Sequence, residues 1–236
     1  MKDTFEIIGL KVTAAGKIIL KGLNLKIKKG EIHILMGPNG AGKTSLVLAA
    51  MGHPGYKVTS GLMTIGKQEI TNLPSEQRSK LGLFVSFQKP PEIPGVSVRN
   101  LLRMAVKDDL EEKIAKNMND LQIKEELVSR SLNENFSGGE MRKMELLQAK
   151  ILEPRFLILD EIDSGLDIDS LKLITKIISQ MSQTAGLLVI THNPRLLKFL
   201  KPDYVHVMLG GRIVKSDGLK LGEEIERRGY SWLAKN

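Results

Sequence analysis

Residues 37–44 read Gly-Pro-Asn-Gly-Ala-Gly-Lys-Thr, and they directly follow the apolar run of residues 32–36. The spacing G-x-x-x-x-G-K-T between a strand and a helix is typical of a phosphate-binding loop, because glycines let successive backbone N–H groups face one point. The positive end of the helix that follows is directed at the same point. A glycine-rich turn is the alternative interpretation, and the lysine and threonine in register disfavour it.

This loop predicts a bound nucleotide. Lys43 can reach the β- and γ-phosphates of a triphosphate, and the hydroxyl of Thr44 can hold Mg²⁺. We expect the nucleotide to contact a continuous run of residues, which comprises Gly37, Pro38, Asn39, Gly40, Ala41, Gly42, Lys43, Thr44 and Ser45.

Length and composition set the limits of the fold. The chain has 236 residues, enough for one large core with a small attached subdomain, and it contains no cysteine for a disulfide or a thiolate metal site. No apolar run reaches the roughly 18–20 residues that a membrane helix needs, and the first residues lack the apolar core of a signal peptide. We therefore expect a soluble, cytoplasmic protein without direct membrane insertion. The formal charge of +8 indicates a lysine-rich solvated surface and no nucleic-acid partner, because aromatic residues make up only 4% of the chain.

Short apolar runs that lead into polar residues predict the core sheet. Residues 32–36 lead into the loop, 83–87 into Gln88, 156–159 into Asp160 and Glu161, and 187–190 into Thr191 and His192. Continuous apolarity is typical of strands buried on both faces of a parallel sheet, where ligands bind beyond the carboxyl ends of the strands. We therefore predict an α/β fold with four buried, mostly parallel strands whose polar residues gather at one edge.

Two other regions differ in pattern. Residues 5–28 alternate and predict antiparallel strands, and residues 61–70 predict a further strand pair that turns at residues 66–67. Residues 97–135 carry dense charge, apolar residues at helical spacing and no glycine, which predicts a helical subdomain inserted into the core. Its entry, residues 89–95, contains three prolines and is expected to be an extended connector.

The polar residues at the predicted sheet edge suit the hydrolysis of a triphosphate. Asp160 ends its strand where a carboxylate can hold Mg²⁺, and Glu161 can polarise an attacking water. Gln88 can sense the metal and the γ-phosphate, and His192 can hydrogen-bond that phosphate. Each residue also has a purely structural interpretation: Asp160 and Glu161 as the start of a loop, Gln88 as a surface glutamine and His192 as a structural histidine. The phosphate-binding loop upstream favours the functional interpretation. We predict Glu161, His192 and Gln88 as catalytic residues and Thr44, Gln88 and Asp160 as metal-binding residues.

Residues 137–140, Ser-Gly-Gly-Glu, predict a capped helix start. Ser137 and Glu140 have the spacing of a capping box ahead of a helical apolar pattern. Gly138 and Gly139 weaken the first turn by up to about 1 kcal/mol each relative to alanine, but they expose backbone N–H groups beside a serine hydroxyl. This second anion-binding tip indicates that a triphosphate is enclosed between two chains, one offering its loop and the other its tip.

A series of motifs along the chain resembles that of an ABC-type ATPase domain. In order, they are the phosphate-binding loop, Gln88, Phe-Ser-Gly-Gly-Glu (136–140), Leu-Asp-Glu (159–161), Ser-Gly-Leu-Asp (164–167) and Thr-His (191–192). The resemblance covers nearly the whole chain and implies that it hydrolyses ATP to ADP and phosphate with Mg²⁺. It implies Glu161 as general base, His192 as switch and residues 137–139 as the contact to the partner's nucleotide, with Asp167 at the junction. It also implies one domain over residues 1–236, in which residues 1–96 and 136–236 form the catalytic α/β core with an antiparallel β subdomain and residues 97–135 the helical subdomain.

Some segments resemble a narrower group, the ATPases of the Suf iron–sulfur cluster assembly machinery. They are residues 88–96, 159–169, 201–207 and 229–233. This resemblance implies SufB-type and SufD-type scaffold proteins as soluble partners and a transient, ATP-dependent homodimer. The cluster itself would sit on the scaffold, in agreement with the absence of cysteine.

Two other functions compete with this interpretation. The ATP-binding subunit of a membrane transporter would share every catalytic residue and would differ in what docks on residues 89–105. A nucleotide-switched interaction protein that does not hydrolyse ATP would need neither Glu161 nor His192, so both residues disfavour it.

Overall fold

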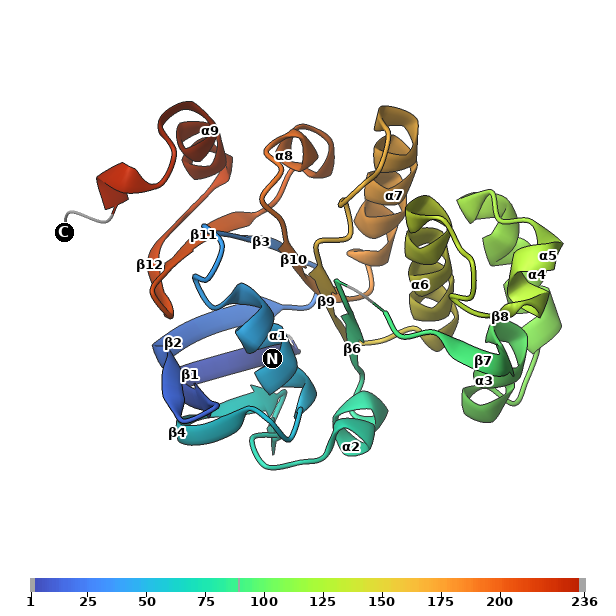
Figure 1. Cartoon of the computed structure of the whole chain (residues 1–236), viewed down its shortest axis with the longest axis horizontal. Coiled ribbons are helices and arrows are strands. Elements are labelled where there is room, and N and C mark those ends of the chain that lie inside the picture. Colours follow the sequence, from blue (N-terminus) through green and yellow to red (C-terminus); the bar gives the residue numbers. More distant parts are fainter. Residues whose placement is uncertain (1–2, 89, 234–236) are drawn as a thin grey trace.

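A six-stranded sheet forms the centre of the molecule (Figure 1). The computed structural model describes residues 3–88 and 90–233, so Lys89 of the predicted connector lies outside the described residues. The strand order is β12-β11-β3-β10-β9-β6, and all neighbours are parallel except β11 and β12. The strands are β3 (Ile32–Met36), β6 (Leu83–Ser86), β9 (Phe156–Asp160), β10 (Gly186–Ile190), β11 (Tyr204–Leu209) and β12 (Arg212–Asp217). The predicted α/β class with a mostly parallel sheet is confirmed.

The register of this sheet brings the predicted strand ends together. Leu187 of β10 lies opposite both Ile32 of β3 and Leu157 of β9, so the three central strands are level. Every residue of these three strands is buried, as the continuous apolar runs predict. β6 is the edge strand and is less buried than predicted: Leu83 and Ser86 are buried, whereas Phe84 and Val85 are only half-buried.

A second, antiparallel sheet packs below the first, with strand order β2-β1-β4-β5. Its strands are β1 (Thr4–Ala14), β2 (Lys17–Lys28), β4 (Lys57–Ile65) and β5 (Gln68–Glu69). The alternation predicted for residues 5–28 is confirmed, and so is the turn at residues 66–67. β4 begins four residues before the predicted position because its first half pairs with β1. Helix α1 (Lys43–Met51) lies between the sheets and shares an apolar cluster with both.

The helices of the inserted segment lie on one side of the sheets (Figure 1). They are α3 (Val98–Ala105), α4 (Leu110–Leu121) and α5 (Glu125–Ser129), as the pattern of residues 97–135 predicts. A short antiparallel pair, β7 (Ile93–Ser97) and β8 (Ser131–Leu132), joins the two ends of the segment. Helices α4 and α6 (Gly138–Leu152) contribute to one continuous apolar cluster, which anchors the insertion on the core.

The remaining helices are α2 (Ser75–Lys80), α7 (Ile168–Met181), α8 (Arg195–Leu200), α9 (Leu219–Arg228) and a 3-10 turn, η1 (Ser231–Leu233). Within residues 3–88 and 90–233, no helix has the length and apolar character to cross a bilayer.

Arg78 of α2 supports the helix that follows the phosphate-binding loop. Its side chain is buried and donates four hydrogen bonds to backbone carbonyl oxygens, from Nη1 to Ala49 (2.8 Å) and Ala50 (2.7 Å), from Nη2 to Thr71 (2.8 Å) and from Nε to Leu73 (2.7 Å). Two of these carbonyls end α1, where a positive charge interacts favourably with the helix dipole. Arg78 thereby connects α1 to the segment after β5.

A buried histidine pair links β3 to β11. His33 Nδ1 lies 2.9 Å from His206 Nε2, and His206 Nδ1 lies 2.7 Å from the hydroxyl of Ser216. Burial lowers the pKa of His206 to about 4, with a smaller contribution from His33, and burial also lowers the pKa of His33. Both rings are therefore neutral in the folded protein at pH 7.

We expect this pair to make the protein less stable in mild acid. The pKa of His206 is lower in the folded state than in the unfolded state, so its contribution is complete above about pH 6.5 and is lost as the pH falls toward 4. At pH 5, His206 alone should lower the free energy of unfolding by about 2 kcal/mol relative to pH 7. Urea unfolding at both pH values would measure this loss. His206→Gln should reduce the loss, whereas the same change at exposed His53 should not, and equal losses in both variants would contradict the assignment.

Candidate functional site

The phosphate-binding loop lies between β3 and α1, as the motif predicts. Gly40 and Gly42 have φ angles of 77° and 109°, which favour glycine. A Cβ added at Gly42 would lie 2.9 Å from Met208 Cε, and one at Gly37 would lie 2.4 Å from the Met208 carbonyl oxygen. The hairpin after β11 also supports the loop, since the Gly211 N–H donates to the Ala41 carbonyl at 2.9 Å. Backbone conformation and close packing therefore both require these glycines.

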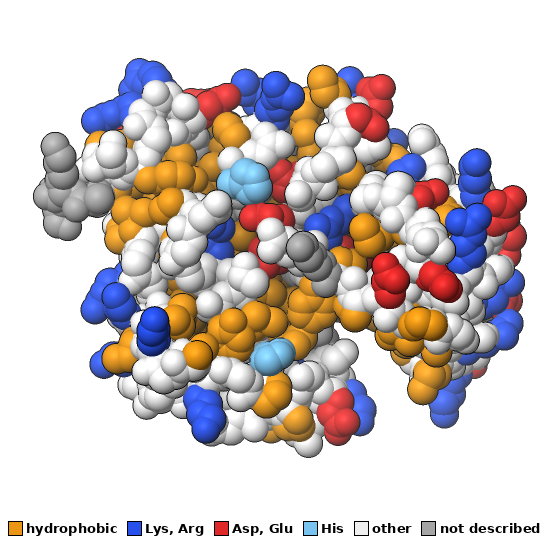
Figure 2. Space-filling view, in the orientation of Figure 1, with side chains coloured by type: hydrophobic (Ala, Val, Ile, Leu, Met, Phe, Trp, Pro, Cys, Tyr) orange, Lys and Arg blue, Asp and Glu red, His pale blue; other side chains and the backbone are white. Residues whose placement is uncertain are grey.

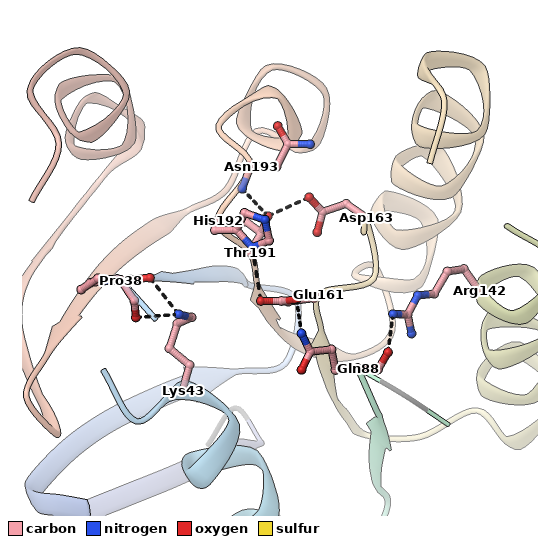
Figure 3. Close-up of polar contacts among 10 residues, drawn as sticks. Pro38, Lys43, Gln88, Arg142, Glu161, Asp163, Thr191, His192 and Asn193 are labelled. Atoms are coloured by element: carbon pink, nitrogen blue, oxygen red, sulfur yellow. Dashed lines mark hydrogen bonds and ion pairs between the residues drawn. The ribbon is translucent and has the colours of Figure 1, made fainter. Parts of the chain in front are cut away.

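Lys43 begins α1, and its ammonium group is held inside the curve of the loop (Figure 3). Nζ donates to the carbonyl oxygens of Gly37 at 2.8 Å and Pro38 at 3.1 Å. Burial lowers the pKa of Lys43, and the nearby carboxylates of Glu161 and Asp160 raise it. The other residues of the predicted nucleotide contact differ in burial. The exposed ones are Pro38, Asn39, Gly40 and Thr44, the buried ones are Gly37, Ala41 and Gly42, and Ser45 is half-buried.

Asp160 ends β9 and is only 1% exposed. Burial raises its pKa to about 6, the charge of Glu161 adds to this rise, and the Thr44 hydroxyl and Lys43 oppose it. Among the described residues, its Oδ1 atom has no hydrogen-bond partner. An unpaired, buried carboxylate oxygen facing a phosphate-binding loop fits a hard cation such as Mg²⁺.

Glu161 follows Asp160 and is contacted by two of the predicted site residues (Figure 3). Gln88 donates from Nε2 to Glu161 Oε2 at 2.5 Å, and His192 Nδ1 lies 3.2 Å from Oε1. The backbone of Glu161 has a φ of 51°, and its N–H donates to the Ile190 carbonyl at 2.9 Å. The ends of β6, β9 and β10 thus bring Gln88, Glu161 and His192 together, as the sequence predicts.

In the space-filling view, acidic side chains and a histidine lie near the centre of the face that is turned to the viewer (Figure 2). His192 is 58% exposed, whereas the Glu161 side chain is 12% exposed. A ligand can therefore reach the histidine from solvent, while the glutamate lies deeper in the site.

The tip before α6 has the predicted capping box. The Ser137 Oγ accepts the Glu140 N–H at 3.3 Å, and the Ser137 N–H donates to Glu140 Oε2 at 2.8 Å. Ser137 and Gly138 are exposed, so another molecule can reach the tip. A Cβ added at Gly138 would meet no described atom within 4 Å, and one at Gly139 would meet only Leu166 at 3.8 Å. The fold of this chain therefore does not require glycine at either position.

A hydrogen bond between two buried polar side chains near the site, Asp163 and Thr191, is absent from the sequence-based prediction. The Asp163 carboxylate accepts the Thr191 hydroxyl at 2.8 Å, and Thr191 Oγ1 accepts the Asn193 N–H at 2.9 Å. This network connects the segment after Glu161 to the loop that carries His192 (Figure 3). Burial raises the pKa of Asp163, and the Thr191 hydroxyl opposes this rise. The only sequence signal for Asp163 is its place as the second aspartate of Asp-Glu-Ile-Asp. That pattern also occurs at many loop starts, so it does not predict a buried hydrogen bond.

Residues 20–164 match the ABC transporter family. The chain belongs to this family, and it is an ABC-type ATPase.

Curated relatives match over nearly their full length. The chain is 46% identical to Vegetative protein 296 of Bacillus subtilis (strain 168), over 98% of this chain and 93% of the relative. It is 45% identical to a probable ABC transporter ATP-binding protein of Streptococcus pyogenes serotype M18, over 98% of this chain and 95% of the relative. Among solved structures, a bacterial ABC transporter cassette in a dimeric structure shares the fold, with a TM-score of 0.78 and 18% identity over 91% of this chain and 98% of that one.

Proposed function

We propose that the chain hydrolyses MgATP in composite sites, each made of the phosphate-binding loop of one copy and the Ser137 tip of another. The convergence of Gln88 and His192 on Glu161, beside the loop, is the observation that carries the proposal. Ser137 and Gly138 of the tip are exposed, and neither Gly138 nor Gly139 is sterically constrained, which supports the contribution of a second copy. The dimeric structure of the similar cassette is consistent with such an arrangement.

Each residue has a role in this proposal. The loop N–H groups and Lys43 bind the β- and γ-phosphates, and Glu161 accepts the proton of the attacking water. His192 hydrogen-bonds the γ-phosphate once its contact with Glu161 gives way, and Gln88 orients Glu161. Thr44, Gln88 and Asp160 would hold Mg²⁺, which supplies positive charge to the phosphate oxygens when bound. Among the described residues no three His, Cys, Asp or Glu side chains form a metal site, so nucleotide oxygens and water must complete this one.

We expect Lys43→Ala to weaken ATP binding. The ammonium group makes a charge-assisted contact to phosphate, and losing such a contact costs roughly 1.5–3 kcal/mol, or about 10- to 150-fold in affinity. Calorimetric titration with ATP and Mg²⁺ would measure the change, and exposed Lys57→Ala serves as the matched control. Equal affinities in the two variants would contradict the role of Lys43.

For the process that this ATPase drives, the names of the relatives favour the ATP-binding subunit of a membrane transporter. A second candidate rests on sequence segments 88–96, 159–169, 201–207 and 229–233, which resemble SufC, the ATPase of the Suf iron–sulfur cluster assembly machinery. In that case SufB-type and SufD-type scaffolds would be the partners. In both cases the partner would dock on residues 89–105, where the connector leads into the first helix of the helical subdomain.

Isolation of the tagged chain from its native cells, followed by identification of stoichiometric partners, separates the two candidates. Recovery with a membrane subunit supports the transporter, and recovery with a scaffold that binds an iron–sulfur cluster supports the Suf role. Substitution of exposed Met104 with aspartate should reduce recovery of either partner, because Met104 is 83% exposed on α3 within the proposed docking region.

A further inference from the structure

A buried ion pair on α6 holds the backbone on both sides of Gln88. Arg142 and Glu145 are 5% and 6% exposed, and Arg142 Nη1 donates to Glu145 Oε2 at 2.8 Å. The same Nη1 donates to the Phe87 carbonyl at 2.8 Å, and Nη2 donates to the Gln88 carbonyl at 2.8 Å. Glu145 Oε1 accepts the Phe87 N–H at 3.1 Å. The pair thus binds three backbone groups of the chain as it leaves β6: the N–H and the carbonyl of Phe87 and the carbonyl of Gln88.

This arrangement is more specific than packing requires. Placing two charges in the interior is costly, and apolar side chains of similar volume often stabilise a fold equally well. Here the guanidinium fork and the carboxylate reach backbone groups more than 50 positions away in the sequence. Planar, bidentate hydrogen bonding of this kind fixes geometry as well as supplying energy.

The contacts continue from Arg142 of this pair into the catalytic site (Figure 3). The Gln88 side chain donates to Glu161, and Glu161 contacts His192. On the other side, Arg142 lies five positions after Ser137 on the same helix, about one and a half turns from the exposed tip. An unbroken series of hydrogen bonds and one rigid helix therefore join the tip to Glu161.

We propose that Arg142 and Glu145 are positioning residues that hold Gln88 against Glu161 and couple the Ser137 tip to catalysis in the same chain. This inference rests on the proposed function, because it assigns the pair a task only if Glu161 activates water. When a second copy's nucleotide engages the tip, movement of α6 moves the backbone of Gln88, and the Gln88 side chain carries that movement to Glu161. A side chain that only stabilised the fold would lack this dependence on Gln88.

A double-mutant cycle tests the proposal. The paired variant Arg142→Met/Glu145→Met removes both charges at similar volume, so neither partner is left buried and uncompensated. We expect its kcat for ATP to fall by at least about tenfold while its KM changes by less than about threefold. In a Gln88→Ala background, the same pair of substitutions should lower kcat by less than about twofold further, since the pair acts through Gln88. An unchanged kcat, or an equal loss in both backgrounds, would overturn the proposal.

Two further variants separate positioning from folding. Arg155→Met removes a different, partly buried arginine, which binds the Asp3 carboxylate and the Leu81 carbonyl oxygen but neither Gln88 nor the phosphate-binding loop, so it should lower the melting temperature without lowering kcat below that temperature. Arg142→Lys keeps the charge but cannot bind both carbonyls and Glu145 in one plane, so it should recover only part of kcat. If the kcat loss in the paired variant matches that in Arg155→Met at equal loss of melting temperature, the pair is only structural. Failure of the proposed function itself would be distinguishable, because Glu161→Gln would then leave turnover unchanged whatever Arg142 does.

Discussion

Glu161→Gln is expected to retain ATP binding, to lose nearly all turnover and to accumulate as a dimer in the presence of ATP and Mg²⁺. The glutamine has the same shape and can still accept the hydrogen bond from Gln88, but it cannot take a proton from water. Loss of a general base typically lowers the rate by about 10²–10⁴-fold. The binding groups of both half-sites remain, so the triphosphate stays enclosed and holds two copies together. Phosphate release measures turnover, and light scattering on a sizing column measures the dimer.

Glu153 offers a matched control for this substitution. It is the C-cap residue after α6, at the end opposite the Ser137 tip, and its φ of 47° is close to the 51° of Glu161; its side chain is exposed. Glu153→Gln therefore makes the same change of charge and shape in a similar backbone conformation, and it should leave both turnover and oligomeric state unchanged. Turnover by Glu161→Gln at the rate of Glu153→Gln would show that another group activates the water.

The parallel core and its polar edge could be predicted from the sequence because each depends on short, local patterns. Runs such as residues 156–159 are apolar throughout and lead directly into Asp160, and a parallel sheet places all such ends at one edge. The phosphate-binding loop is equally local, since its glycines are required by backbone conformation and by contact with Met208.

The pair Arg142 and Glu145 could not be predicted in the same way. On a helix with apolar residues at regular spacing, an arginine and a glutamate three positions apart indicate a solvated face. Their burial comes from contact with Phe87 and Gln88, which lie more than 50 positions earlier. The small sheet of β7 and β8 was missed for a related reason: Pro94 argues against a central strand, and β7 is a short two-stranded edge element where proline is tolerated.

The Ser137 tip offers a direct test of the two-copy site, because a charge can be added there with an N-cap residue still in place. Aspartate is as good an N-cap residue as serine, so Ser137→Asp should keep the bond to the Glu140 N–H at the start of α6, while its carboxylate displaces the Glu140 side chain that Ser137 Oγ contacts at 2.7 Å. Its carboxylate would face the partner's triphosphate and repel it. We expect Ser137→Asp to lose most turnover while each chain still binds nucleotide through its own loop. Ser137→Asn, also a good N-cap but uncharged, is the matched control and should lose less.

At an ATP concentration too low to occupy the Lys43→Ala loop, mixing that variant with Ser137→Asp should then restore activity. In a heterodimer of Lys43→Ala and Ser137→Asp chains, one site combines the intact loop of the second chain with the intact tip of the first, and the other site carries both defects. Random pairing makes half of the dimers mixed, so the mixture should reach about a quarter of wild-type turnover if one complete site is sufficient. Phosphate release from each variant alone and from their equimolar mixture measures this recovery. A mixture no more active than the mean of its components would mean that the tip does not act on the nucleotide of a neighbouring copy.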